Sequence, residues 1–474
     1  MKNSFFLSKK LFGFFVGILV FGFFFGCQND LQTEDTNDMV ALKSAKTTNF
    51  VVISKSETLT GDLEQSLAKF GTIVKTIPQI GIVVVQTLDP NFEKKVTMLA
   101  NVRSVVPDLI VNSIAPKVQP MANPPSLGDN EPGFFLQWGM DAINAPEAWN
   151  AGYQGAGAKV FILDSGIDAE QTDLAPNLNT TLSKSFVPGE DWNIQPGDYF
   201  NHGTHVAGIV AAADNSIGVI GVAPKAEIVA VKVLTEQEGW GYFSWIIEGI
   251  IYAADNGADV INMSLGGVVN KNGFYFDEDG NLIGRDSPKL IQELKHAIQK
   301  AIDYTYKSGT TIVVAGGNSY MNGDGNGSTI AILADLNNVI AVSATAPYGW
   351  IYDKTTNLDI IASYSNTGRS LINIAAPGGD FDLYFAEDPT ATNYVYDMVL
   401  STGNDDTYWF AAGTSMAAPH VAGVAALIIG KNGGQMVPIE VTKQLLKTAD
   451  KLDGNGASVS FGKGRVNAFR AVTE

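Results

Sequence analysis

Residues Lys159 to Gly166 read KVFILDSG, an apolar run that ends in an aspartate, a serine and a glycine. Branched and aromatic side chains in such a run favour a buried strand. Similar runs recur along the chain and alternate with Ala- and Gly-rich stretches of helical spacing. Near-continuous apolar strands that alternate with helices indicate a parallel sheet covered on both faces. The predicted fold class is therefore a three-layer α/β/α arrangement with a mostly parallel sheet.

The predicted strands and helices set the positions of the motifs discussed below. The strands are Lys159–Leu163, Ile228–Leu234, Val260–Met263, Thr311–Val314, Val339–Val342 and Ile372–Ile374. The helices are Gly203–Ala213, Ser244–Asp255, Leu290–Ser308, Ser415–Ile429 and Pro438–Ala449. Residues 270–288 and 380–408 break the alternation and are predicted to be surface insertions.

Composition and charge exclude several classes of protein. Of the 474 residues, 45% are hydrophobic and 17% are charged, which is enough apolar material for a sizeable core. The formal net charge is −18. Because nucleic-acid-binding proteins normally carry a basic face, no nucleic-acid partner is expected. The single cysteine, Cys27, excludes an intrachain disulfide and a zinc site built on paired cysteines.

The N-terminus has the pattern of an export signal. Lys9 and Lys10 precede an apolar run from Leu11 to Phe25, which is shorter than the ~20 residues of a spanning helix. Residues 1–26 are therefore predicted to be a signal peptide. The Gly-Cys pair that follows resembles a bacterial lipoprotein signal, which implies a lipid on Cys27 and a membrane anchor; the alternative is an ordinary signal with an incidental cysteine. Residues 27–48 are polar and acidic, as in a flexible tether.

Residues 49–115 are predicted to form a separate unit. Strands at Phe50–Ile53, Ile73–Ile77, Ile80–Gln86 and Val102–Val106 enclose helices at Leu63–Phe70 and Phe92–Leu99. The order β-α-β-β-α-β is that of the ferredoxin-like α+β motif. Residues 116–130 are rich in Pro, Asn and Ser and are predicted to be an exposed linker and maturation region.

Three peptides of the following domain, residues 131–474, carry residues with catalytic chemistry. Asp164 follows a predicted buried strand, at the edge of an α/β sheet where sites form. His202 opens a helix in HGTHVAG, and Ser415 opens another in GTSMAAPH. Taken singly, each could be an ordinary cap or turn residue. The other histidines of these peptides, His205 and His420, are predicted to be structural.

Together these residues can perform nucleophilic catalysis. A serine hydroxyl needs a base, a neutral histidine can supply it, and a buried carboxylate fixes the histidine tautomer. No HExxH spacing is present, so no catalytic metal or other cofactor is expected. Two alternatives stay open: a catalytically weak peptide-binding protein of the same fold, and another serine hydrolase such as an esterase. Esterases usually show GxSxG, whereas Ser415 lies in GTSMA.

The peptides DSGID, HGTHVAG and GTSMAAPHVAG, in this order, resemble the signature peptides of the subtilisin-like serine proteases, or subtilases. The resemblance implies a subtilisin-like fold and a triad of Asp164, His202 and Ser415. It implies a serine endopeptidase that cleaves protein or peptide substrates through an acyl-enzyme. By its position, the unit 49–115 resembles the subtilase propeptide, an intramolecular inhibitor, so the protein is expected to be a zymogen.

The same resemblance implies further site residues. Asn318 and the backbone N–H of Ser415 would form the oxyanion hole. An extended substrate would be held by β-augmentation between two edges, whose residues are Gly239, Trp240 and Gly241 on one side and Ser264, Leu265, Gly266 and Gly267 on the other. Gly266, Gly267, Ala315, Gly316 and Gly317 would wall the main specificity pocket. These small residues are expected to leave room for a large apolar side chain.

A structural calcium ion is also implied, because Asp214 to Val219 resembles the calcium loop of the family. The implied ligands are Asp173, Ala213, Asn215, Ile217 and Val219, with Asp129 or Glu131 as a further candidate. A second stretch, Asn322–Gly327, alternates oxygen side chains but lacks the glutamate of an EF-hand, and a plain loop is expected there. The expected location is outside a bacterial cell, lipid-anchored at a membrane or the cell surface, with release after propeptide cleavage as one outcome.

Overall fold

The computed structural model describes residues 48–112, 117–121, 130–197, 199–276, 282–285, 287–325, 327–381, 394–454 and 457–474. Residues 1–47, which include the predicted signal peptide, Cys27 and all of the predicted tether except Thr48, lie outside these residues. Within the described ranges, no helix has both the length and the apolar character needed to cross a membrane.

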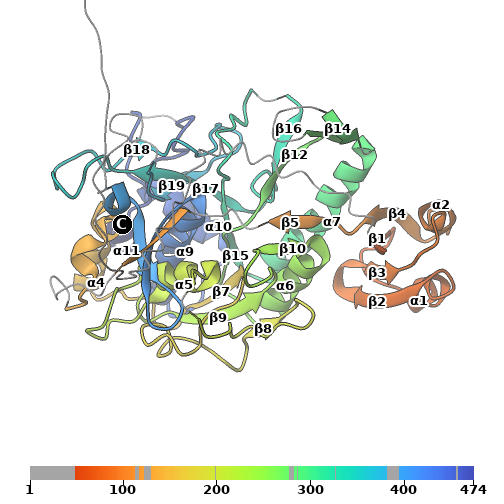
Figure 1. Ribbon diagram of the computed structural model, residues 1–474, viewed down its shortest axis with the longest axis horizontal. Helices are drawn as coiled ribbons and strands as arrows, with labels where there is room; N and C mark the ends of the chain where they lie inside the picture. Colours follow the sequence, from red (N-terminus) through yellow and green to blue (C-terminus); the bar gives the residue numbers. More distant parts are fainter. Residues whose placement is uncertain are drawn as a thin grey trace, which may run out of the picture. The chain divides into compact units, whose positions relative to one another are not determined.

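The centre of the larger domain is an eight-stranded, mainly parallel sheet (Figure 1). Its order is β18-β17-β15-β11-β7-β9-β8, and β19 also pairs with β17. The strands are β7 Lys159–Asp164, β8 Lys184–Ser185, β9 Glu227–Lys232, β11 Val260–Met263, β15 Thr311–Ala315, β17 Ile340–Ala346, β18 Ile360–Ile361 and β19 Ile374–Pro377. All six of the strands predicted for this domain are present; β11 has the predicted bounds, and the other five differ at one or both ends by one to four residues.

Helices cover both faces of this sheet, which confirms the three-layer prediction. Phe161 and Leu163 of β7 pack with α6 (Phe243–Asp255) and α7 (Pro288–Lys307) in one apolar cluster. Val160 and Ile162, which alternate with them along the strand, belong to the apolar cluster on the opposite face, which includes α5 (His202–Ala211) and α9 (Thr414–Lys431). Because successive strand residues point to opposite faces, both faces of β7 are buried.

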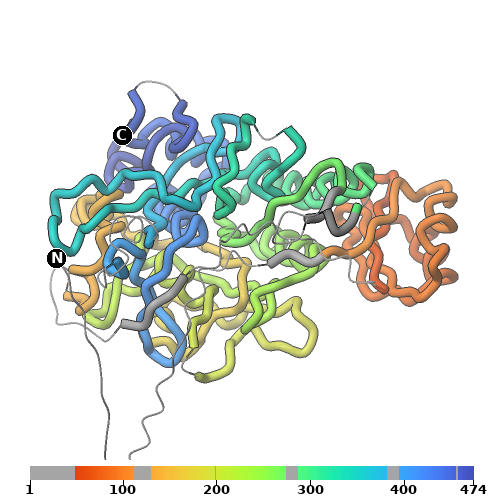
Figure 2. The backbone as a smooth tube through the Cα atoms, turned by 45° about the horizontal axis from the view of Figure 1, so that its top comes forward, coloured from red at the N-terminus to blue at the C-terminus, as the bar shows by residue number. Residues whose placement is uncertain are grey.

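The domain has further elements outside this sheet. They are η2 Phe134–Leu136, α3 Trp138–Ala142, α4 Ala145–Asn150, β12 Gly267–Asn270, β13 Phe274–Phe276, β14 Leu282–Arg285, β16 Thr329–Ile332, η3 Tyr394–Asp397, α10 Pro438–Thr448 and α11 Ala468–Thr473. Helix α11 lies beside α4 (Figure 2), and the Ala468 amide donates to the Ile143 carbonyl at 2.7 Å. The beginning and end of the domain are therefore held together.

Two predictions about connecting segments need correction. The end of the predicted insertion 380–408 forms β20 (Val399–Thr402), which is buried and pairs antiparallel with β21 (Tyr408–Ala412). Residues 382–393 lie outside the described ranges. Part of the predicted linker forms β6 (Lys117–Met121), which pairs antiparallel with the other edge of β21. These residues therefore belong to a three-stranded sheet.

The N-terminal unit has the element order that the sequence predicts. It comprises β1 Asn49–Ser54, α1 Gly61–Leu67, β2 Thr72–Ile77, η1 Pro78–Ile80, β3 Ile82–Gln86, α2 Phe92–Val96 and β4 Val102–Pro107. Its antiparallel sheet has the order β2-β3-β1-β4. The predicted strand at Ile80–Gln86 begins later, because Gly81 turns the chain with φ 65°.

One face of this small sheet packs against the larger domain. Val51, Ile82 and Val106 share an apolar cluster with α6 and α7. Lys75 pairs with Glu248 at 2.8 Å, and Arg103 pairs with Glu293 at 3.1 Å. Because such partly exposed ion pairs contribute little to stability, the apolar burial is the larger favourable contribution to this contact.

After β4, the chain caps one of these helices. The buried Asp108 carboxylate accepts a hydrogen bond from the Ser244 amide at 3.1 Å and another from the Ser244 hydroxyl. Ser244 lies in the first turn of α6, so Asp108 satisfies a helix amide from a distant part of the chain. The next residues form β5 (Ile110–Asn112), which pairs antiparallel with β10 (Trp240–Tyr242).

Asp108 should make stability pH-dependent. Burial raises the pKa of Asp108 to about 6, although hydrogen bonds from Ser244 oppose the shift and the Glu248 carboxylate adds to it. A carboxyl group whose pKa is raised by folding stabilises the protonated native state, so its contribution falls as the pH rises from about 4 to about 6. In a full-length Ser415→Ala background, Asp108→Asn should reduce the fall in melting temperature over this range. The exposed Asp62→Asn is the control, and equal pH profiles for the two variants would contradict the assignment.

Candidate active site

The structure brings the predicted aspartate and histidine into direct contact. Asp164 is the last residue of β7, and its Oδ1 lies 2.8 Å from Nδ1 of His202, the first residue of α5. The exposed fractions of Asp164 and His202 are 1% and 6%. Among the described residues, His202 Nε2 has no hydrogen-bond partner. The ring is therefore oriented by the carboxylate, with its second nitrogen available for proton transfer.

The predicted nucleophile lies at the N-terminus of the central helix. Ser415 is the second residue of α9 and is fully buried. Its hydroxyl donates to the Ser264 carbonyl at 3.1 Å, and its own carbonyl accepts from the Ser264 hydroxyl at 2.7 Å. Ser264, predicted as a substrate-edge residue, thus also fixes the backbone and side chain of the nucleophile.

Polar side chains fasten the loop after β7 to the start of α5. Asn201 caps α5, since its Oδ1 accepts from the Thr204 amide at 2.8 Å. The Asn201 amide group donates to Ser165 Oγ at 3.2 Å, and the Gly203 amide donates to the same oxygen at 3.1 Å. These contacts set the relative position of Asp164 and His202. The sequence analysis missed them, although an Asn directly before a helix is a recognisable cap signal.

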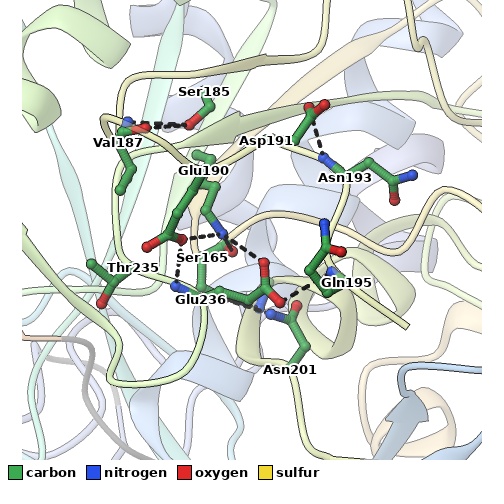
Figure 3. A network of polar contacts seen from close by, with 12 residues as sticks. Ser165, Ser185, Val187, Glu190, Asp191, Asn193, Gln195, Asn201, Thr235 and Glu236 are labelled. Atoms are coloured by element: carbon green, nitrogen blue, oxygen red, sulfur yellow. Dashed lines mark hydrogen bonds and ion pairs between the residues drawn. The ribbon is translucent and has the colours of Figure 1, made fainter. Parts of the chain in front are cut away.

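A buried lysine supports the same loop. Lys232, paired with Asp164 in the parallel register of β7 and β9, is fully buried. Its Nζ lies 2.6 Å from the Ser165 carbonyl and 3.0 Å from Glu190 Oε2. Figure 3 shows Glu190 and Glu236 converging beside Ser165. Because an unpaired buried charge is costly, these carboxylates are required partners. The sequence signal that could have revealed this buried ion pair is a lysine, Lys232, inside an otherwise apolar strand.

The predicted oxyanion residue is held in a defined orientation. Asn318 lies just beyond β15, and its Oδ1 accepts from the Thr414 amide at 2.9 Å and the Thr414 hydroxyl at 2.7 Å. Thr414 Oγ1 also accepts from the Gly317 amide at 3.0 Å. Because both contacts of Thr414 use the carbonyl oxygen of Asn318, the amide nitrogen remains the donor group of this side chain. This orientation supports the predicted role, and Thr414 is a supporting residue that the sequence analysis missed.

The predicted substrate edges form strands or adjoin them. Trp240 and Gly241 lie in β10, directly after Gly239, and this edge pairs with β5 of the chain itself. On the other side, Leu265 is buried and Gly267 begins β12, which pairs with β16. A Cβ on Gly266 would have the Ile332 carbonyl as its nearest neighbour, at 3.3 Å.

The small residues predicted as pocket walls have a packing reason. A Cβ on Gly316 would lie 2.7 Å from the Val342 carbonyl oxygen. Gly317 has φ 104°, and a Cβ there would lie 2.3 Å from Asn366 Nδ2. Ala315, at the end of β15, is buried. Residues 342 and 366 therefore leave no room for a side chain at positions 316 and 317, which explains the two glycines. The preference for a large apolar substrate side chain stays a prediction.

Two carboxylates at the predicted calcium loop fit a cation. Asp173 is fully buried; its Oδ2 accepts from the Val219 amide at 2.9 Å, while Oδ1 has no partner among the described residues. Glu131 Oε1 accepts from the amides of Asn215 at 3.0 Å and Ser216 at 2.9 Å, and its Oε2 is buried with no partner in the described ranges. Burial raises the pKa of Asp173 to about 7. Buried carboxylate oxygens without donors are the kind of group that calcium satisfies.

The other ligands would have to be neutral oxygens. No group of three or more His, Cys, Asp or Glu side chains able to hold a metal occurs in the part of the chain described. Ala213, Ile217 and Val219 could contribute only backbone carbonyls, and Asn215 its amide oxygen. The alternative candidate Asp129 lies outside the described residues. In the second loop, Asp324 accepts hydrogen bonds from the Arg369 and Ser370 amides.

The two remaining histidines of the signature peptides are neutral and internally bonded. Burial lowers the pKa of His205 to about 3 and that of His420 to about 4. His205 Nε2 lies 2.9 Å from the Trp409 carbonyl, and His420 Nδ1 lies 2.8 Å from the Met416 carbonyl. These contacts agree with the structural roles expected for both residues.

The α/β/α fold, the Asp164–His202 contact and the position of Ser415 at the start of α9 are consistent with a serine protease of the Asp–His–Ser class. A model of the subtilase family, peptidase S8, matches residues 155–464. Subtilisin DY of Bacillus licheniformis is 39% identical over 337 residues, which cover 71% of this chain and 98% of that protein. Subtilisin E of Bacillus subtilis is 37% identical over 337 residues, or 71% of each chain. The chain therefore belongs to the subtilase family and is a subtilisin-like serine protease.

A solved structure supports the same fold. The epidermin leader peptide processing serine protease of Staphylococcus aureus superposes with a TM-score of 0.70 at 24% identity, over 90% of this chain and 97% of that one. At this identity, the likeness concerns the fold.

The Asn318 geometry leads to a graded mutational prediction. Asn318→Ala should lower kcat about 100-fold or more with little change in KM, a magnitude taken over from subtilisin, where loss of one oxyanion donor has this effect. Thr414→Val removes one of the two contacts that orient Asn318, so a loss on the order of tenfold is expected. Steady-state kinetics would measure both. The exposed Asn322→Ala is the control, and an Asn318→Ala enzyme with unchanged kcat would refute the assignment.

Proposed function

We propose that this protease is an endopeptidase that is exported as a lipid-anchored zymogen and hydrolyses peptide bonds through an acyl-enzyme. The buried 2.8 Å contact between Asp164 and His202 carries the catalytic part of the proposal. Ser415 Oγ attacks the scissile carbonyl while His202 takes its proton, and the same histidine then protonates the leaving amine. Asp164 orients the ring and stabilises the imidazolium. Water releases the acyl group in the reverse sequence.

The zymogen proposal rests on strand pairing within the chain. β5 lies antiparallel on β10, the edge predicted for substrate, and β6 lies antiparallel on β21, which leads into Ser415. An added antiparallel strand is how an extended peptide binds a sheet edge. Only residues 113–116, which lie outside the described ranges, separate β5 from β6. We therefore narrow the predicted cleavage region, residues 113–130, to the bonds between Asn112 and Lys117.

The location of the enzyme follows from the order of its segments. The proposed lipid on Cys27 lies N-terminal to the propeptide, residues 49–115, so cleavage after Asn112 severs the covalent link between anchor and enzyme. The catalytic domain would then leave the membrane or be held through the apolar contact of the propeptide with α6 and α7.

Calcium is proposed as a structural ion. Asp173, Asn215 and Glu131 would hold it with the carbonyls of Ala213, Ile217 and Val219. When bound, the ion would supply charge compensation for two buried carboxylate oxygens, Asp173 Oδ1 and Glu131 Oε2, which have no hydrogen-bond donor among the described residues. It takes no part in the catalytic step.

Ser415→Ala tests catalysis and maturation together. The variant should lose peptidase activity and labelling by a serine-directed covalent probe, because both require the nucleophile. It should also accumulate as a full-length, membrane-bound precursor, whereas the wild type gives a shorter, soluble enzyme if cleavage is autocatalytic. Cell fractionation and blotting with an antibody to the C-terminus would show both forms.

The exposed Ser308→Ala serves as the control for this experiment. Wild-type-like turnover in purified Ser415→Ala protein would refute the catalytic assignment. A fully active, full-length wild-type protein in the membrane would instead refute the zymogen proposal. Turnover of acyl esters without peptide hydrolysis would favour the esterase alternative.

Calcium removal should destabilise the mature enzyme. An ion that binds only the native state stabilises it by mass action, so exhaustive chelation should lower the melting temperature and added calcium should restore it. Asn215→Ala and Asp173→Asn should blunt this response, while Asn322→Ala in the second loop should leave it intact. Scanning calorimetry with and without chelator measures the effect. Identical melting curves for the wild type would remove the proposed site.

A further inference from the structure

The loop that leads into β10 is tied to that strand by its first residue. The Thr235 amide donates to the Trp240 carbonyl at 2.7 Å, and the Trp240 amide donates to Thr235 Oγ1 at 3.2 Å. Trp240 begins β10, the edge predicted for substrate. Glu236 follows Thr235 directly, so the contacts that hold Glu236 also hold this end of the substrate edge.

One carboxylate oxygen of Glu236 binds the segment that precedes His202. Glu236 Oε1 accepts from the Gln195 amide at 3.0 Å and from the Tyr199 hydroxyl at 2.5 Å. Tyr199 comes three residues before His202, the first residue of α5. A hydrogen bond to a carboxylate is stronger than one between neutral groups. Glu236 therefore fastens the β10 loop to the segment from which α5 begins.

The other carboxylate oxygen of Glu236 faces the support of Asp164. Glu236 Oε2 forms an ion pair with Lys232 Nζ at 3.5 Å. The Lys232 ammonium donates to the Ser165 carbonyl at 2.6 Å, and the Ser165 amide donates to Asp164 Oδ1 at 2.7 Å. Figure 3 shows Glu236 beside Ser165 and Gln195. Glu236 thus connects the substrate edge with the supports of both partners of the Asp–His contact.

Glu236 is the more buried of the two carboxylates that pair with Lys232. The exposed fraction of its side chain is 11%, against 32% for Glu190, and the Lys232 side chain is fully buried. Water and salt screen a buried pair less than an exposed one. Loss of the Glu236 carboxylate would leave the buried ammonium with its more exposed partner. It would also remove the acceptor of two donors in the segment before α5.

We propose that Glu236 is a positioning residue, which holds the substrate edge β10 in a fixed place relative to the Asp164–His202 pair. This inference rests on the proposed endopeptidase function. Proteolysis requires the scissile carbonyl to lie within reach of the nucleophile, and a misplacement of about 1 Å can cost about 100-fold in rate. A substrate that pairs with β10 is placed by that edge, whereas a substrate with one residue before the scissile bond is not. The effect of Glu236 on the rate should therefore depend on substrate length.

Cleavage of two anilides by the processed enzyme tests this role. Both carry the same large apolar last residue, and in the long anilide three further residues precede it and can pair with β10. The measured quantity is the ratio of kcat/KM for the long anilide to kcat/KM for the short one. In Glu236→Ala this ratio should fall about tenfold or more. Glu238→Ala is the matched control, because Glu238 is an exposed carboxylate in the same loop, and its ratio should equal that of the wild type.

Three further variants separate the contact from a general loss of stability. Glu236→Gln keeps an oxygen that can accept from Tyr199 and Gln195, so the ratio should return to within about threefold of the wild type. Tyr199→Phe removes only the hydroxyl and should lower the ratio about threefold. The double variant Tyr199→Phe, Glu236→Ala should lose no more than Glu236→Ala alone, because both changes remove the same contact.

The outcomes separate the positioning role from the proposed function. If both anilides are cleaved and the ratio is unchanged in Glu236→Ala and Tyr199→Phe, the role of Glu236 is refuted and the protease assignment stands. Equal losses for the two anilides, or the same loss in Glu238→Ala, would point to a general effect on the fold or on the charge of the loop and would also overturn the role. If Glu236→Ala fails to mature, an unchanged ratio in Tyr199→Phe is enough to refute it. If the wild type cleaves neither anilide, the proposed function fails, and the positioning role with it.

Discussion

The hydrogen bond between Asp164 and His202 is the contact on which the arrangement of the domain depends, because it joins two layers of the fold. Asp164 ends a strand with both faces buried, and His202 begins a helix that covers one of those faces. A buried carboxylate without this partner would be costly, so α5 must begin at the carboxyl edge of the sheet. The close approach requires Gly203, since a Cβ there would lie 2.1 Å from the Gly166 carbonyl oxygen.

The same hydrogen-bonding arrangement occurs twice around the site: a side-chain oxygen just beyond the end of a strand accepts a hydrogen bond from an amide in the first turn of a helix. Beside β7, Ser165 Oγ accepts from the Gly203 amide of α5. Beyond β15, Asn318 Oδ1 accepts from the Thr414 amide of α9. Helix N-termini offer amides without intrahelical partners, and these contacts use them. The catalytic groups are thus positioned by hydrogen bonds from helix N-terminal amides to side chains beyond the strand ends. Lys232, paired with Glu190 and Glu236, supports the connection beside β7.

Much of the sheet and the Asp–His contact could be predicted because the signals are local. Buried parallel strands read as apolar runs, and β11 has the predicted bounds without any shift. The features that the sequence analysis missed depend on residues that are distant in the sequence. β6 contains Pro120 and lies in a Pro-rich stretch, so it reads as a linker, yet an edge position of a sheet tolerates proline. β20 is short, and only its pairing with β21 makes it a strand. Lys232 gives a signal, but its partners Glu190 and Glu236 come from loops that sequence patterns do not bring together.

In the proposed zymogen, strand addition would link inhibition to substrate recognition. Segment 110–112 pairs with β10, the edge predicted for substrate, so tighter self-pairing would mean a better-occupied site in the precursor. Cleavage between this segment and residues 117–121 would have unequal consequences on the two sides. The first segment would leave with a unit that packs on α6 and α7 through apolar contacts. The second would stay covalently attached to the enzyme, at a high effective concentration next to β21. Exposure of the predicted substrate edge would therefore depend on the apolar contact of the propeptide and not on the pairing of residues 117–121.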